Sequence, residues 1–315
     1  MPLKTSLRRL PNSRRRIEIV LGVSFGVLAV IGAVAEESVS IKSDSAKPEL
    51  IVGGLVEYLP GTLPLIISAP HGGRLGPETI PDRRGGVKGA DVSSDLLALE
   101  IVAALQRRTG ASPHLVICHL KRSKVDCNRD ALTGTEGHAA AMAVWQAYHD
   151  LIEQARRTLD RGLLIDLHGH GHPERRVEFG YRLSGAQLGE SAESLAARES
   201  DSSISALASG GTGDFLERLR GPSSLGGLLE ARGYPSIPSP KIHAPGESPY
   251  FQGGFTVDRY RSRSPDDLVA ALQMETPLVG IRDTEENRRR FAEAFAEALE
   301  TYFQIHLGIN FPKVG

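Results

Sequence analysis

The sequence predicts an α/β fold built on a mixed, largely parallel sheet that helices cover on both faces. From residue 50 onward, short apolar segments alternate with longer segments in which apolar residues recur at helical spacing. The apolar segments are nearly continuous, which is typical of strands buried on both faces. Polar residues that could bind a metal or take part in catalysis follow these segments, in the loops that carry function in an open α/β sheet.

The short apolar segments are the expected strands. We expect a strand or hairpin in "LIVGGLVEYLPG" (50–61) and further strands in "TLPLIISAPHGG" (62–73), "PHLVICHLKR" (113–122), "GLLIDLHG" (162–169), "VEFGYRLSG" (177–185) and "LVAALQMETP" (268–277). Helices are expected over residues 91–108, 139–159 and 285–303, where apolar side chains recur every three or four positions. Residues 191–227 are rich in Ser, Gly and Ala and are expected to form an excursion or a mobile lid.

The N-terminal segment predicts export. Five arginines among the first 16 residues precede an apolar run from Ile19 to Ala35, and the small residues Ala33 and Ala35 stand before Glu36. This order is that of a secretory signal, and the run is shorter than the ~20 residues of a comfortable membrane span. We therefore expect a signal peptide or N-terminal anchor over 1–35, a linker over 36–49 and one folded domain over 50–310.

Composition narrows the possible chemistry. A net charge of −1 over 315 residues offers no basic surface for nucleic acid. The two cysteines, Cys118 and Cys127, are too few for a disulfide framework or a four-cysteine zinc site. Any metal chemistry must therefore depend mainly on histidine, carboxylate and water.

Four strand ends carry the candidate residues. They are His71 in "SAPHGG"; Arg122, Asp126, Asn128 and Arg129 in "HLKRSKVDCNRD"; Asp166, His168, His170 and His172 in "LLIDLHGHGHP"; and Glu275 in "QMETP". Each has an ordinary structural reading, such as a turn histidine, a surface ion pair or a salt bridge between Asp166 and His168. Asp166 and His168 face the same side of an extended strand, and Glu275 is costly to bury unless it is paired or linked to a metal.

Taken together, these residue types match a zinc hydrolase. Such enzymes use two or three nitrogen or oxygen ligands, an open position for water, a carboxylate as general base and a cation for the developing oxyanion. A forked arginine often holds a substrate carboxylate. No nucleophile elbow, P-loop or dinucleotide motif competes with this reading.

The combination resembles the N-formylglutamate amidohydrolase family, which has the zinc-carboxypeptidase-like (phosphorylase/hydrolase-like) sandwich fold. The resembling segments are "SAPHGG", "GADVSSDLLALEI", "KRSKVDCNRD", "IDLHGHG", "YFQGGFTVDRY" and "ALQMET", in the family's order. They extend from Ser68 to Thr276, so the resemblance implies one catalytic domain over 50–310.

The resemblance also implies roles for individual residues. It implies His71 and His168 as ligands of one zinc ion, or of another divalent metal, and Glu275 as the general base. Arg122 resembles the arginine that polarises the oxyanion, while Asn128 and Arg129 resemble the pair that holds the substrate's α-carboxylate. Tyr250 is expected to contact the substrate, with Tyr260 and the Gly253–Gly254 loop closing over it.

One position departs from the pattern of zinc carboxypeptidases. Their ligand glutamate stands three residues after the first histidine, and Arg74 occupies that position here. Asp91 resembles a family aspartate and is the expected third ligand, with Glu78 and His170 as alternatives. His172 is expected to be a solvated loop residue.

These expectations describe an exported, zinc-dependent amidohydrolase. Its expected substrate is a small N-acyl (N-formyl) amino acid or peptide fragment with a free carboxylate. We expect no nucleic-acid partner and membrane contact only through the N-terminal segment. An exported zinc carboxypeptidase or peptidoglycan peptidase, and a non-catalytic carboxylate-binding homologue, remain open alternatives.

Overall fold

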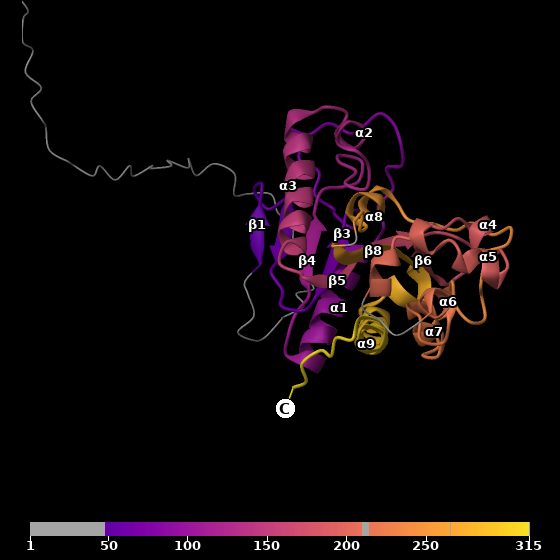
Figure 1. Ribbon diagram of the computed structural model, residues 1–315. Coiled ribbons are helices and arrows are strands. Elements are labelled where there is room, and N and C mark those ends of the chain that lie inside the picture. Colours follow the sequence, from indigo (N-terminus) through magenta and orange to yellow (C-terminus); the bar gives the residue numbers. More distant parts are fainter. Residues whose placement is uncertain (1–47, 210–213, 265, 315) are drawn as a thin grey trace, which may run out of the picture. The chain divides into compact units, whose positions relative to one another are not determined.

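The computed structural model describes residues 48–209, 214–264 and 266–314, which form one eight-stranded sheet with surrounding helices (Figure 1). The strands are β1 (Glu49–Ile51), β2 (Val56–Leu59), β3 (Leu65–Ala69), β4 (His114–Cys118), β5 (Arg161–His170), β6 (Val177–Gly180), β7 (Ser236–Ile237) and β8 (Leu268–Pro277). The expected signal peptide or anchor over 1–35 and nearly all of the 36–49 linker lie outside the described residues.

The order of the strands is β1-β2-β4-β3-β5-β8-β6-β7. The central strands β4, β3, β5 and β8 run parallel. The pairs β1–β2, β2–β4 and β6–β8 are antiparallel, and β7 pairs parallel with β6. The prediction of a mixed, largely parallel sheet is therefore confirmed. Strand β7 was not expected, because two residues are too few to give a periodic pattern.

The three long helices follow the expected segments closely. They are α1 (Ser94–Thr109), α3 (Ala139–Arg156) and α9 (Glu285–Tyr302). The shorter helices are α2 (Ala131–Thr135), α4 (Gly185–Leu188), α5 (Ala192–Ala196), α6 (Phe215–Arg220), α7 (Leu225–Glu230) and α8 (Phe255–Tyr260). The 3-10 turns are Glu199–Asp201 and Ser205–Ser209, and π-type turns follow β8 (Leu278–Arg282) and α9 (Phe303–Leu307).

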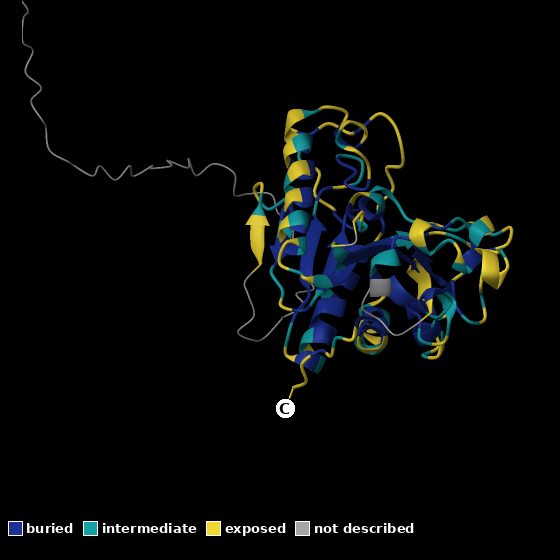
Figure 2. Ribbon diagram, in the orientation of Figure 1, coloured by how far each residue is buried: buried dark blue, intermediate teal, exposed yellow. Residues whose placement is uncertain are grey.

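Two apolar cores lie on opposite faces of the sheet, because successive side chains of a strand point to opposite sides. Leu163, Ile165 and Leu167 of β5 belong to the core that includes α1 and α9. Leu164 of β5 belongs to the other core, which includes α3 and Val257 of α8. Burial on both faces explains why the central strands read as continuous apolar segments, and Figure 2 shows them dark blue between helices with exposed outer sides.

The described part of residues 191–227 is packed rather than lid-like. Leu195, Leu219 and Leu225 are fully buried in the α1/α9 core. The polar composition of this segment predicted an excursion, but regularly placed leucines anchor its short helices. We find no helix within 48–209, 214–264 and 266–314 whose length and hydropathy would suit a membrane span.

Candidate metal centre

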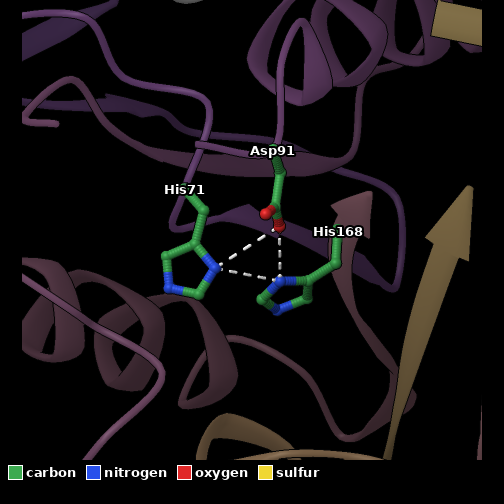
Figure 3. Close-up of side chains that lie close together, drawn as sticks. All are labelled: His71, Asp91 and His168. Carbon is green, nitrogen blue, oxygen red and sulfur yellow. Dashed lines mark hydrogen bonds and ion pairs between the residues drawn. The ribbon is translucent and has the colours of Figure 1, made fainter. Parts of the chain in front are cut away.

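Three candidate ligands meet at the carboxyl ends of the central strands (Figure 3). His71 comes two residues after β3, His168 lies near the end of β5, and Asp91 precedes α1. The backbone N–H of Asp91 donates to the carbonyl of His71 (3.1 Å), which fixes the two loops together. All three side chains are buried.

The donor atoms of these residues form a nearly regular triangle. His71 Nδ1 lies 3.1 Å from His168 Nδ1 and 3.4 Å from Asp91 Oδ2, and His168 Nδ1 lies 3.0 Å from Asp91 Oδ2. Zinc–nitrogen bonds of 2.0–2.1 Å in a tetrahedron place ligand atoms about 3.3 Å apart. The three side chains therefore have the spacing of one face of a zinc coordination sphere.

A carboxylate holds the far nitrogen of each imidazole. His71 Nε2 lies 2.8 Å from Asp126 Oδ1, and His168 Nε2 lies 2.8 Å from Asp166 Oδ2. Asp166 is itself fixed by the hydroxyl of Ser68, which donates to Oδ1 at 2.6 Å. Carboxylates in this position orient metal-binding imidazoles and set their tautomer.

The tautomers explain why a cation fits here. Because Asp126 and Asp166 accept hydrogen bonds, both Nε2 atoms carry the proton of a neutral imidazole, and both Nδ1 atoms present lone pairs. Two lone pairs and one carboxylate oxygen then converge, and the backbone N–H of Gly169 donates to that oxygen at 3.2 Å. A cation relieves this repulsion, so the residues present fit a divalent metal.

The pKa shifts also indicate that the site stabilises a positive charge. Burial opposes protonation of His168, but Asp166 and Asp91 outweigh it and raise the pKa of His168 well above its usual value. Burial also opposes ionisation of Asp91, yet hydrogen bonds with His168 and His71 hold its pKa well below the usual range. The carboxylates at this site therefore stabilise a positive charge, whether a proton or a metal supplies it.

Glu275 lies beside the ligands on the neighbouring strand. It is directly opposite His168 in the β5–β8 register and is buried. Gln273 donates to its Oε1 at 2.8 Å, while Oε2 has no hydrogen-bond partner among the described residues. Burial raises the pKa of Glu275 to about 7; His168 opposes the shift, and Asp91 and Glu178 add to it. A buried carboxyl with one free oxygen and this pKa suits a general base.

Arg122 lies against the carboxylates of the site. Its Nη1 is 3.4 Å from Asp91 Oδ1, and its Nε is 3.2 Å from Asp126 Oδ2. Asp126 also lies 3.6 Å from the guanidinium of Arg83, which no sequence pattern indicated. Arg122 thus adjoins the candidate metal ligands, as an arginine serving an oxyanion must.

Asn128 and Arg129 differ sharply in their surroundings. The Asn128 side chain is buried, with Nδ2 3.2 Å from His168 Nε2, and its Oδ1 accepts from the Thr256 backbone N–H at 2.9 Å. Gly254 gives this amide room, since a Cβ there would overlap it. Arg129 is exposed, so the structure brings Asn128 into the site and leaves Arg129 facing solvent.

The two predicted tyrosines have their hydroxyls engaged elsewhere. Tyr250 donates to the carbonyl of Phe179 at 2.6 Å, and Tyr260 donates to the carbonyl of His149 at 2.9 Å. Burial raises the pKa of Tyr250 and is likewise the largest cause of the raised pKa of Tyr260. In this structure both tyrosines fix the 250–260 segment to the domain instead of presenting a hydroxyl to the site.

The alternative third ligands lie apart from the triangle. Glu78 is exposed, and Arg74 pairs with Asp95 (3.2 Å). His170 belongs to a second cluster with His172 and Glu178. His172 is half-buried and lies 3.0 Å from Glu178, so the expectation of a solvated loop residue was wrong.

Two buried residues were missed by the sequence reading. Glu178 stands alone between apolar residues in β6, the same pattern that singled out Glu275. Arg282 donates to the carbonyls of Val92 and Thr276, next to Asp91 and Glu275. An arginine just past the end of a strand gives no sequence pattern that distinguishes it from a surface residue.

Comparisons with known proteins found similar solved structures at low sequence identity. No family model and no curated protein matches the sequence. The structure is similar to N-formylglutamate amidohydrolase from Ralstonia eutropha JMP134 (TM-score 0.48, 15% identity, 81% of this chain and 99% of the other). It is also similar to a gene product of Agrobacterium tumefaciens (0.45, 12%, 79% and 94%) and to succinylglutamate desuccinylase from Chromobacterium violaceum (0.36, 13%, 86% and 76%).

Proposed function

We propose that this protein is a metal-dependent amidohydrolase that cleaves the amide bond of a small N-acyl amino acid, such as an N-formyl amino acid, or of a peptide-like substrate with a free carboxylate. The observation that carries the proposal is the convergence of His71, Asp91 and His168 beside Glu275. Zinc bound there would polarise the substrate carbonyl and acidify a water molecule.

Side chains of this chain carry out the proton transfers, stabilise the developing charge and bind the substrate. Glu275 has one carboxylate oxygen without a hydrogen-bond partner in the described structure, and this oxygen takes a proton from the attacking water. The same carboxyl then gives the proton to the leaving nitrogen, so that the acid and the amine depart. Arg122 stabilises charge that develops on the carbonyl oxygen, and Asn128, which lies inside the site, holds the substrate carboxylate.

Hydrolysis assays with metal analysis test this proposal. The purified protein should release free amino acid from a panel of N-formyl and N-acyl amino acids, lose activity with a chelator, and regain it with zinc. Glu275→Gln should abolish turnover while the metal stays bound. Glu78→Gln is the matched control, since Glu78 is exposed, and should leave both metal and turnover unchanged. Equal activity before and after metal removal would exclude the mechanism.

We also propose that the chain is exported. The basic residues, the apolar run and the small residues before Glu36 support this proposal. Residues 1–40 fused to a reporter that is active only outside the cytoplasm should give signal, and a fusion with Arg14, Arg15 and Arg16 changed to Glu should not. Equal signal from both fusions would argue against export.

A further inference from the structure

Glu178 controls the orientation of the His172 imidazole. Glu178 is fully buried, and its Oε1 lies 3.0 Å from His172 Nδ1. Its Oε2 accepts from the backbone N–H of Phe251 at 3.0 Å. Because a carboxylate accepts hydrogen bonds, His172 carries a proton on Nδ1, and in the neutral imidazole Nε2 presents a lone pair.

Further contacts fix the ring plane and the backbone of His172. The ring stacks on Phe251 with centroids 4.7 Å apart and an interplanar angle of 14°. The backbone N–H of His172 donates to His170 Nδ1 at 3.1 Å, and His170 Nε2 donates to the Arg176 carbonyl at 2.9 Å. Within the described chain, nothing hydrogen-bonds to His172 Nε2, and the side chain is 16% exposed. An oriented imidazole thus presents one free acceptor.

This imidazole adjoins the reaction site through the register of the sheet. Glu178 is directly opposite Glu275 in the β6–β8 pair, and Glu275 is directly opposite His168 in the β5–β8 pair. Opposite residues on neighbouring strands point to the same face, and in an antiparallel pair such as β6–β8 their Cβ atoms lie about 4.5–5.5 Å apart. A candidate metal ligand, the candidate base and the carboxylate that orients His172 therefore stand in one row.

We infer that His172 is a substrate-binding residue whose Nε2 accepts a hydrogen bond from the N–H of the scissile amide. The inference rests on the proposed function and specifies its substrate as a secondary amide. In a trans amide the N–H and the C=O point in opposite directions. Holding the N–H at His172 therefore turns the carbonyl oxygen away from it, toward the His71–Asp91–His168 side of the row. Phe251, which is 42% exposed, lies beside the same contact.

A second metal ion held by His170, His172 and Glu178 is the competing explanation. The three ligand atoms lie close enough for it. However, the Arg176 guanidinium already lies 3.6 Å from Glu178 Oε1, and a metal would have to displace the N–H that occupies His170 Nδ1. A resident cation and an occupied lone pair both disfavour a metal here.

A matched pair of substrates tests the contact. An N-acyl amino acid and the ester analogue with oxygen in place of the amide N–H differ chiefly in the proposed donor. His172→Phe keeps an aromatic ring against Phe251 but lacks the acceptor. One lost neutral hydrogen bond predicts a fall in kcat/KM of about 5- to 10-fold for the amide. The ester should change less than about twofold.

Three further readouts separate the outcomes. In the Glu275→Gln background, His172→Phe should weaken binding of the amide, measured by calorimetry, by the same factor and leave ester binding unchanged. Metal analysis should give one ion per chain with and without His172→Phe. Equal losses for amide and ester, or a fall from two ions to one, would overturn the inference. If the unsubstituted protein neither binds nor cleaves any N-acyl amino acid, the proposed function itself fails and the inference falls with it.

Discussion

The two histidine clusters each contain two histidines and one carboxylate, but they differ in their hydrogen bonds. In the first, His71, His168 and Asp91 turn acceptors toward one another, because Asp126 and Asp166 take the protons of the far nitrogens. In the second, a donor stands between each pair of acceptors: the Nδ1 proton of His172 faces Glu178, and the His172 backbone N–H faces His170.

The difference shows how the position of a proton decides the role of a histidine. Converging acceptors repel one another until a cation binds, whereas acceptors already paired with donors are satisfied as they stand. The first cluster is therefore suited to a metal, and the second to holding one imidazole for a ligand. Only one residue separates His168 from His170, so sequence proximity says little about function.

The largest expected effect is the loss of a ligand from the first cluster. His71→Ala or His168→Ala should reduce bound metal to a small fraction of one ion per chain and lower kcat/KM on the order of a thousandfold. Metal analysis and kinetics measure both. His243→Ala, at an exposed histidine outside both clusters, is the control and should change neither. Full metal content in His168→Ala would place the metal elsewhere.

A smaller effect is expected at the carboxylates behind the ligands. Asp166→Asn keeps an oxygen near His168 but weakens its hold on the Nε2 proton, so the metal Kd should rise about 10- to 100-fold. Titration against a chelator of known affinity measures the change. Asp160→Asn, at an exposed carboxylate just before β5, is the matched control. An unchanged Kd in Asp166→Asn would mean that the acceptor geometry does not depend on this carboxylate.

The two glycines between the histidines provide a stability test. A Cβ at Gly169 would overlap the buried guanidinium of Arg282, whereas a Cβ at Gly171 would meet nothing within 4 Å. Gly169→Ala should lower the free energy of unfolding by about 1–3 kcal/mol. Gly171→Ala should change it by less than about 1 kcal/mol. Denaturant unfolding compares them, and equal losses would show that Arg282 relaxes easily.

His149, which belongs to neither cluster, should make the free energy of unfolding depend on pH. Burial is the main cause that lowers the pKa of His149 to about 3. The unfolded chain protonates near 6.5 while the folded chain does not, so unfolding takes up a proton between these values. Stability from this group is complete above pH 6.5 and falls by about 1.4 kcal/mol per unit below it, down to about pH 3. His149→Gln should show a shallower decline in denaturant unfolding; an identical decline would contradict the buried neutral imidazole.

Much of the fold was predictable because its strands are apolar and its helices periodic. The limits of β8 agree with the expected segment residue for residue, and the central helices shift by three residues or fewer at either end. The strand order was not predictable, because nothing local states that β8 lies between β5 and β6. The packed helices of residues 191–227 were obscured by their polar composition.

The individual site residues were predictable from the sequence, but the pairs that they form were not. His71, Asp91, His168 and Glu275 all stood out at strand or helix ends. The partner of His71 is Asp126, 55 residues further along the chain, and only the folded sheet brings the two together. Glu178 was missed although it has the same isolated position in an apolar strand as Glu275. Both carboxylates are costly to bury without a partner, so the same physical argument applies to Glu178 as to Glu275.

The register between β5 and β8 makes activity a measure of correct strand pairing. All ten residues of β5 pair with all ten of β8, from Arg161 with Leu268 to His170 with Pro277. A slip of one residue would turn Glu275 to the opposite face and bring Met274 or Thr276 to its place. A misregistered chain would keep a plausible sheet but present no carboxylate beside His168. Activity per bound metal therefore reports on correct strand alignment, which spectroscopic measures of β-content would not detect.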